Sequence, residues 1–159
     1  MTAGLFPEEN VNDIFFSRHD TNELLGSASH HPFTLEDKEW PTVEHYYQAS
    51  LFDNPDLQER IRQLPTADAA IAFTKWRFFQ KKSGWKKLRQ VLMTRAVYTK
   101  CKTYGNIAEA LLATDDKKLV ENSAYDYFWG CGRDRRAENT YGKVMMNVRE
   151  KLKEELASN

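Results

Sequence analysis

The residues best suited to chemistry are grouped around Glu44, in the sequence Trp-Pro-Thr-Val-Glu-His-Tyr-Tyr-Gln-Ala. Pro41 restricts the residue before it to extended conformations, and Thr42 is a suitable N-cap, so a helix is expected to begin here. Glu44 then lies in the first turn, where the helix dipole favours an ionised carboxylate. Tyr47 and Gln48 share its face. This arrangement suits the binding and cleavage of a flat, polar small molecule, although a first-turn acid can also serve its helix alone.

A second acid, Asp126, precedes the sequence Trp129-Gly130-Cys131-Gly132 in a segment rich in aromatic rings. Pairs of carboxylates are used in glycoside hydrolysis, whose transition state has oxocarbenium character. One carboxylate can stabilise that charge or deprotonate water, while a second holds ribose hydroxyls or assists the leaving base. The two glycines permit a close approach of the backbone to a ligand. The alternative for Asp126 is that it accepts hydrogen bonds from its own loop backbone.

Two tryptophans, Trp85 and Trp129, are candidates to stack on a base or cover a sugar face. Ring-on-base stacking contributes about 1–3 kcal/mol per base in nucleic-acid binders. Core packing is the alternative for Trp85, which heads an amphipathic stripe. It is the simpler interpretation for Trp40 and Trp76.

A basic loop directly after the Trp-Gly motif contains Arg133, Arg135 and Arg136. Its guanidinium groups are candidates for phosphate binding, and a solvated loop is the alternative. Asn139 is a candidate substrate contact that also fits the N-cap of the last helix. His45 points away from the acid beside it, because successive helix positions do not face each other, and we interpret it as structural. Four lysines are expected on exposed faces: Lys81, Lys82, Lys86 and Lys87.

Length and composition limit the class of protein. The 159 residues suffice for one domain with a proper core, which we place over residues 1–159. Lys plus Arg and Asp plus Glu both number 23, so net charge gives no argument for avid nucleic-acid binding. The four histidines and two cysteines, Cys101 and Cys131, lack metal-ligand spacing, so we expect no metal and no cofactor. Without a signal peptide or an apolar run of roughly 20 residues, a cytoplasmic protein without membrane association is expected, as a monomer or weak oligomer.

Periodicity and turn residues predict a mainly α (α+β) fold: a single compact helical domain of about six helices with a small β element near the N-terminus. Strands are expected at 14–16 and 33–35. Helices are expected at about 43–52, at 56–64, after a Thr66 cap, at about 85–104, from an Asn106 cap to about 114, and from about 140 onward. The segment 115–138 is expected to be largely irregular.

Two of these helices carry apolar stripes that should face the core. In the long central helix the stripe comprises Trp85, Leu88, Leu92, Ala96 and Thr99, widened by Val91. In the last helix it comprises Tyr141, Val144, Met145, Val148, Leu152 and Leu156.

The order and spacing of these motifs resemble the NADAR, or YbiA-like, family. The resemblance rests on the block that ends at 40–49, on Trp85 before a central helix, on the Asp-x-x-Trp-Gly-x-Gly block at 126–132, and on the Asn-x-x-Gly helix at 139–149. It covers nearly the whole chain, from about residue 16 to about residue 152. The resemblance implies a YbiA-like fold.

Family members look like N-glycosidases of ribosylated bases. The resemblance implies hydrolysis of phosphorylated ribosylamino-pyrimidine intermediates of riboflavin biosynthesis, a form of metabolite damage control. One alternative is removal of ADP-ribose from guanine bases, so that nucleic acid enters only as an ADP-ribosylated substrate. Another is a non-catalytic module that binds ADP-ribose or nucleotides. Carried over by motif, Glu44 and Asp126 are the expected catalytic residues, and Trp85 and Trp129 the expected substrate contacts.

Two stretches depart from the family pattern. A serine-asparagine-phenylalanine stretch is common where this chain has residues 25–30, and a glycine-arginine pair is common where it has residues 72–75. If the missing groups contact phosphate or base, this protein binds a different substrate. Lys75 and Arg77 are the candidate replacements for the missing arginine.

Overall fold

The computed structural model describes residues 12–159 of the chain. This part contains six α-helices, one short 3-10 helix and four short strands, and it confirms the expected mainly helical fold with a small β element. The helices are α1 (Val43–Ser50), α2 (Pro55–Arg62), α3 (Ala67–Lys75), η1 (Phe78–Gln80), α4 (Trp85–Thr103), α5 (Gly105–Leu112) and α6 (Thr140–Ala157). The strands are β1 (Ile14–Phe16), β2 (Phe33–Leu35), β3 (Lys38–Trp40) and β4 (Leu119–Glu121).

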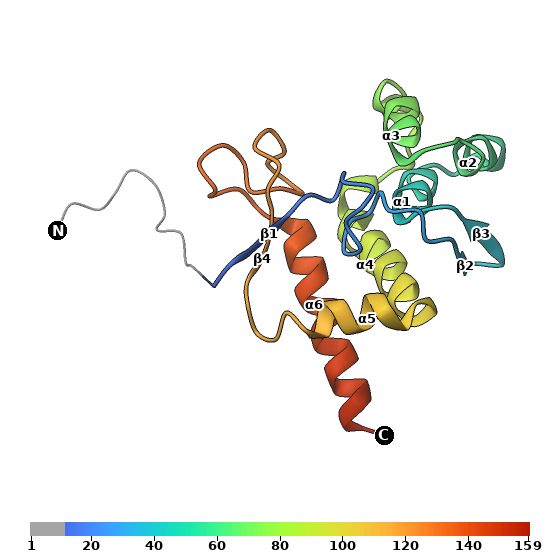
Figure 1. Cartoon of the computed structure of the whole chain (residues 1–159). Helices are drawn as coiled ribbons and strands as arrows, with labels where there is room; N and C mark the ends of the chain where they lie inside the picture. Colours follow the sequence, from blue (N-terminus) through green and yellow to red (C-terminus); the bar gives the residue numbers. More distant parts are fainter. Residues whose placement is uncertain (1–11) are drawn as a thin grey trace.

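The strands form two separate pairs (Figure 1). β1 pairs in parallel with β4, so the first described segment lies beside one from the last third of the chain. β2 and β3 form an antiparallel hairpin. The turn residues Glu36 and Asp37 have φ values of 55° and 63°, which are the left-handed conformations of a tight two-residue hairpin turn.

The sequence predicts β1 and β2 but neither of their partners. β4 lies in the segment expected to be irregular, and all three of its residues are buried. It therefore lacks the alternation of apolar and polar residues that identifies a half-buried strand. β3 begins at Lys38, directly after the two turn residues, in a stretch for which the sequence predicts no strand.

The core lies where α1, α4 and α6 meet, with α5 packed beside α4 and α6 (Figure 1). The predicted stripe of α6 is buried except for Leu156, which is 61% exposed. The predicted stripe of α4 is wrong at Val91, which is 51% exposed, whereas Met93 and Val97 are buried. Because α1, α5 and α6 all contact α4, the buried face of α4 includes Met93 and Val97 and leaves out Val91.

Two of the predicted helix caps are confirmed. The Thr42 hydroxyl accepts a hydrogen bond from a backbone N–H of α1, and the Thr66 hydroxyl does the same for α3. The predicted Asn106 cap is wrong, because α5 already begins at Gly105. Tyr104, in an extended conformation, separates α4 from α5 and caps neither helix with its side chain.

Asn139 precedes α6 as predicted, but its side chain does not cap the helix. Its Oδ1 accepts a hydrogen bond from the Glu121 N–H at 2.9 Å, and its Nδ2 donates one to the Leu119 carbonyl at 2.9 Å. Asn139 itself has a φ of 49°, a left-handed conformation that asparagine tolerates better than most residues. The side chain therefore fastens β4 to the start of α6.

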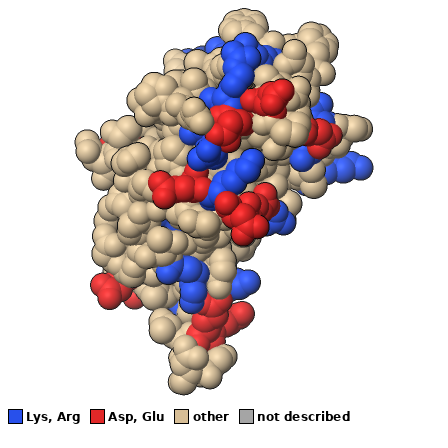
Figure 2. Space-filling view, turned by 90° about the vertical axis from the view of Figure 1, so that its right-hand side faces the viewer, with Lys and Arg blue, Asp and Glu red and all other residues tan. Residues whose placement is uncertain are grey.

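Charges of both signs lie side by side on one face of the molecule (Figure 2). On the face shown in Figure 2, basic and acidic side chains alternate and neither sign forms a broad patch, as the balance of charges in the sequence suggests. In residues 12–159, no helix is long and apolar enough to cross a membrane. The expectation about a signal peptide concerns the first residues, and residues 1–11 lie outside the described part.

The contact between α6 and β4 leads to a first prediction. A Cβ at Gly142 would lie 2.2 Å from the Leu119 carbonyl oxygen and 2.4 Å from Asn139 Nδ2. Gly142→Ala should therefore lower the free energy of unfolding by about 1–3 kcal/mol or more. Gly105→Ala is the matched control: nothing lies within 4 Å of its added Cβ, so it should leave stability unchanged or raise it by up to about 1 kcal/mol. If Gly142→Ala and Gly105→Ala unfolded at the same urea concentration, the close packing at Gly142 would be contradicted.

Candidate active site

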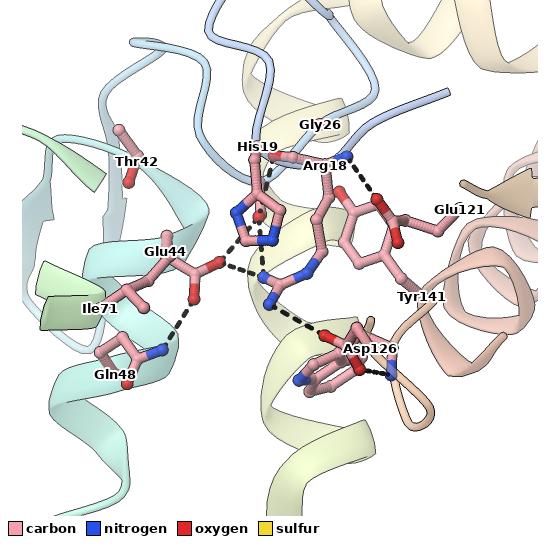
Figure 3. A network of polar contacts seen from close by, with 12 residues as sticks. Arg18, His19, Gly26, Thr42, Glu44, Gln48, Ile71, Glu121, Asp126 and Tyr141 are labelled. Atoms are coloured by element: carbon pink, nitrogen blue, oxygen red, sulfur yellow. Dashed lines mark hydrogen bonds and ion pairs between the residues drawn. The ribbon is translucent and has the colours of Figure 1, made fainter. Parts of the chain in front are cut away.

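A buried arginine that the sequence does not identify lies at the centre of the site (Figure 3). Arg18 follows β1, and its side chain is only 6% exposed. Its Nη1 lies 2.7 Å from Oε2 of Glu44, and its Nη2 lies 3.8 Å from Oδ2 of Asp126. The guanidinium therefore joins the two acids that the sequence predicts as catalytic residues.

Glu44 is fully buried at the start of α1, and both of its carboxylate oxygens have partners. Oε2 accepts hydrogen bonds from Arg18 and from the Ser27 hydroxyl, each at 2.7 Å. Oε1 accepts one from Gln48 Nε2 at 2.8 Å. Burial by itself would raise the pKa of this carboxyl, but the Arg18 charge and the two other hydrogen bonds hold the pKa below its ordinary value. Glu44 is thus an enclosed, ionised anion.

Asp126 is more accessible, with 27% of its side chain exposed. Its Oδ1 accepts hydrogen bonds from the Phe128 and Trp129 backbone N–H groups, at 3.0 and 2.7 Å. The predicted alternative for this residue, a bond to its own loop backbone, is therefore confirmed for one oxygen. The other oxygen is directed toward Arg18, and the residue lines a cleft. The loop contacts and a role in the site are compatible.

A third acid, Glu121 at the end of β4, contacts the backbone of Arg18. The sequence does not identify it as part of the site. It is fully buried, and its Oε1 accepts a hydrogen bond from the Arg18 backbone N–H at 3.1 Å. A Cβ at Gly130 would lie 2.7 Å from Oε2 of Glu121. Gly132 has a φ of 70° and packs against the Tyr127 ring. Contacts within the protein account for both glycines, whose expected role was close approach to a ligand.

A cleft of about 270 Å³ opens between α1 and α3 on one side and the start of α4 and residues 126–129 on the other. Five of the predicted site residues line it: Tyr47, Gln48, Trp85, Asp126 and Trp129. Seven predicted site residues do not line it: Glu44, Gly130, Gly132, Arg133, Arg135, Arg136 and Asn139. Glu44 and Arg18 lie directly behind the lining, because Gln48 bonds Glu44 and Asp126 faces Arg18.

The aromatic side chains of the cleft form a connected wall. Trp129 packs edge-on against Tyr47 and Phe128, with ring centroids 5.3 and 4.7 Å apart. Burial raises the pKa of the Tyr47 hydroxyl well above its ordinary value, so this group remains a hydrogen-bond donor at neutral pH. The core position predicted for Trp40 is confirmed, whereas that of Trp76 is wrong, because its side chain is 79% exposed.

The cations that line the cleft are not those of the predicted phosphate loop. Arg133 packs over the Tyr125 ring, and the guanidinium of Arg135 lies over Phe15. Lys75, Lys81 and Arg89 line the cleft instead. Lys75 belongs to the stretch where the family arginine is missing. Lys81 and Lys82 are both half-buried, so the expectation of exposed faces is wrong for these two and confirmed for Lys86 and Lys87.

The loop that carries Ser27 is held in place by a buried lysine of α4. Lys100 Nζ donates hydrogen bonds to the carbonyls of Leu24 and Gly26, each at 2.8 Å, and to the Ser29 hydroxyl at 2.6 Å. Burial lowers the pKa of Lys100 to about 8. This loop is the first stretch that departs from the family pattern, and its Ser27 hydroxyl donates a hydrogen bond to Glu44.

His45 has the structural role that the sequence predicts. Its Nδ1 lies 2.7 Å from the Thr42 hydroxyl, and its Nε2 lies 2.9 Å from the Leu64 carbonyl. The ring therefore joins the start of α1 to the segment after α2. Burial lowers the pKa of His45, so the neutral ring is favoured.

Side chains that bind metals are dispersed. In residues 12–159, no three His, Cys, Asp or Glu side chains gather as ligands of a metal ion would. Cys101 and Cys131 are buried free thiols, and burial raises the pKa of both. They contribute to packing.

Comparison with known proteins gives a consistent result. The model of the NADAR domain family matches residues 5–153. An N-glycosidase from Nostoc punctiforme is 37% identical over 132 residues, which is 81% of this chain and 85% of that protein. A riboflavin biosynthesis protein from Vibrio vulnificus is 38% identical over 144 residues, but the chain spans only 39% of its length.

A solved structure is also similar to this one. The NMR structure of the Escherichia coli protein YbiA superimposes with a TM-score of 0.83 at 29% identity and covers 92% of this chain and 88% of that one. The E. coli protein is named as an N-glycosidase and is 30% identical over 145 residues, which is 89% of this chain and 91% of that protein. The family model matches nearly the whole chain, and the Nostoc relative is 37% identical over 85% of its own length. The chain therefore belongs to the NADAR domain family.

Proposed function

We propose that this protein is an N-glycosidase that hydrolyses phosphorylated ribosylamino-pyrimidine intermediates of riboflavin biosynthesis. The observation that carries the proposal is the line of charges from Asp126 through Arg18 to Glu44 at the wall of an aromatic cleft. The names of the relatives, two N-glycosidases and a riboflavin biosynthesis protein, support the reaction and the pathway.

Asp126 is the acid best placed to meet the substrate, because it is the only carboxylate of residues 12–159 that lines the cleft. Its Oδ1 is fixed by two backbone N–H groups, which leaves Oδ2 to stabilise positive charge at the anomeric carbon or to orient water. In hydrolysis, the bond from the anomeric carbon to the amine nitrogen breaks. The water oxygen joins the carbon, and the nitrogen leaves with a proton.

Glu44 acts through its neighbours in this proposal. It is fully buried, so its carboxylate orients Arg18 and Gln48 and balances the guanidinium charge. Arg18 in turn attracts the Asp126 carboxylate across a gap of 3.8 Å and so helps to hold it in position. The flat base fits the aromatic wall of the cleft, where rings can stack on it.

The size of the cleft favours the smaller of the candidate substrates. Its volume of about 270 Å³ lies at or below the lower end of small-molecule sites, which span roughly 300–1,000 Å³. A ribosylamine with a single phosphate suits this volume better than ADP-ribose linked to guanine, the second candidate. A non-catalytic binding module would have no need for a carboxylate held next to a buried arginine.

Direct incubation with both substrates tests the function. The purified protein should release free base and sugar phosphate from a phosphorylated ribosylamino-pyrimidine, detected by chromatography and mass spectrometry. It should act far more slowly on ADP-ribosylated guanosine. Faster turnover of the ADP-ribosyl substrate would favour the second candidate, and binding without turnover of either would favour a non-catalytic module.

Removing the charge of Asp126 should stop the reaction without unfolding the protein. Asp126→Asn retains an oxygen that can accept the two loop N–H bonds but loses the carboxylate, so kcat/KM should fall by roughly 10²–10⁴-fold. Glu44→Gln should also cause a large loss. Because Glu44 acts on Asp126 through Arg18, the double variant should lose less activity than the sum of the two single losses.

Near-wild-type turnover of Asp126→Asn would reject its assignment. Fully additive losses in the Glu44 and Asp126 variants would show that the two acids act independently. Circular dichroism and thermal unfolding of each variant provide the control for folding.

The buried ion pair also predicts an unusual pH dependence of stability. Arg18→Met leaves Glu44 buried without its cation and should lower the free energy of unfolding by about 3–5 kcal/mol near neutral pH. In the wild type, the pKa of Glu44 is lower in the folded than in the unfolded protein. Ionised Glu44 therefore stabilises the fold above its unfolded-state pKa, and this stability is lost as the pH falls through its folded-state pKa. In the variant, burial dominates and raises that pKa, so the variant should gain stability from about pH 8 to about pH 5.

Urea unfolding of both proteins across this pH range measures the difference. The control is Arg18→Met combined with Glu44→Met, which removes both charges and should recover most of the lost stability but no turnover. If the stability of Arg18→Met alone fell toward low pH, as in the wild type, Arg18 would not be what sets the pKa of Glu44.

A further inference from the structure

The cleft holds cations that have no acidic partner. In residues 12–159, no salt bridge joins Lys75, Lys81 or Arg89 to a carboxylate, whereas the neighbouring Lys82 pairs with Asp53 at 3.5 Å. Cations that line a cleft without a carboxylate partner can form charge-assisted hydrogen bonds with a bound anion, so this part of the cleft is a candidate anion site.

Two of these cations are brought together on one aromatic ring. Lys81 Nζ lies 4.2 Å from the centroid of Trp85, and the Arg89 guanidinium lies 5.5 Å from the same ring. Arg89 also packs over Phe128, 3.5 Å from its centroid. The rings fix both side chains by cation–π contact. The result is a preformed pair of like charges.

The pair is electrostatically strained in the absence of an anion. Burial, and then the nearby Arg89 charge, lower the pKa of Lys81. An anion between the two groups would offset that repulsion and form charge-assisted hydrogen bonds with both.

A chain of ring contacts leads from this pair to Arg18, which lies beside the acids. Arg89 contacts Phe128, Phe128 contacts Trp129, and Trp129 lies 5.6 Å from Arg18. A substrate with its anomeric carbon at Asp126 would therefore extend along the rings and place a group at its other end near Lys81 and Arg89. For a ribose phosphate, that group is the phosphate.

We propose that Lys81 and Arg89, held on Trp85, form the subsite for the substrate's phosphate and determine the preference for a phosphorylated ribose. This rests on the proposed function for the orientation of the substrate. The subsite replaces the arginine loop 133–136 as the site of phosphate recognition, because that loop does not line the cleft.

Binding of ribose 5-phosphate and of ribose, measured by calorimetry, tests the subsite without turnover. The wild type should bind ribose 5-phosphate more tightly than ribose. Lys81→Gln and Arg89→Gln should each weaken ribose 5-phosphate binding by on the order of tenfold and leave ribose binding nearly unchanged. Lys81→Arg should retain the preference, because it keeps the charge.

Lys86→Gln is the matched control. Lys86 also lies near Trp85, 5.7 Å from the ring centroid, but it does not line the cleft, so its variant should bind both ligands as the wild type does. Equal weakening of both ligands by Lys81→Gln and Arg89→Gln, or no weakening at all, would overturn the subsite. An Arg133→Gln variant that alone lost the preference would return phosphate binding to the loop.

The outcomes separate the two proposals. In one outcome, the wild type prefers ribose 5-phosphate through Lys81 and Arg89 but releases no base from any ribosylamine. That result would support the phosphate subsite and refute the N-glycosidase activity. A wild type that hydrolyses phosphorylated and dephosphorylated ribosylamines at equal rates would retain the enzyme and refute the subsite. Melting temperatures of all variants verify that they are folded.

Discussion

One buried positive charge imposes the main constraint on this structure. The guanidinium of Arg18 lies in the interior, where removing an ion from water costs several kcal/mol unless partners offset it. Glu44 and the Ser27 hydroxyl contact Nη1, and Asp126 lies beyond Nη2. The end of β1, the start of α1 and the loop before α6 must therefore meet at one point. A fold that separated any of them would leave a charge unpaired in the interior.

Several long-range polar contacts keep these elements together. The parallel register of β1 and β4 places Phe16 opposite Glu121, so the Arg18 N–H reaches the Glu121 carboxylate. Asn139 then fastens β4 to α6, and Lys100 fastens the Ser27 loop to α4. The last two contacts each join a short strand or a loop to a long helix. The site is thus supported by rigid elements, as precise chemistry requires.

The parts of the site that the sequence predicts are those encoded locally. The Thr42 cap, the shared face of Glu44 and Gln48, and the turn formed by Asp126 each follow from residues within a few positions of one another. The fold class follows in the same way, because six helices with recognisable periodicity and boundaries dominate the chain. Local rules of helix and turn chemistry are sufficient for this much.

The parts that the sequence misses depend on segments far apart in the chain. Arg18 and Glu121 become partners only through the parallel pairing of β1 and β4. Neither strand has a pattern that indicates its partner. Lys81 and Lys86 illustrate the same limit on the surface: both approach Trp85, yet only Lys81 lines the cleft. Charge in the sequence does not distinguish a solvated lysine from one directed at a ligand.

The cleft is lined by charges of both signs, and this bears on how it would orient a substrate. Asp126 lies beside Arg18, whereas Lys81 and Arg89 lie against the ring of Trp85. In the proposed binding mode, the acid meets one end of the substrate and the two cations meet the other. A ribosylamine phosphate develops positive charge at its anomeric carbon and carries negative charge at its phosphate. Only one of its two orientations along the cleft satisfies both ends, so the charges that bind the substrate also direct the scissile bond to the acid.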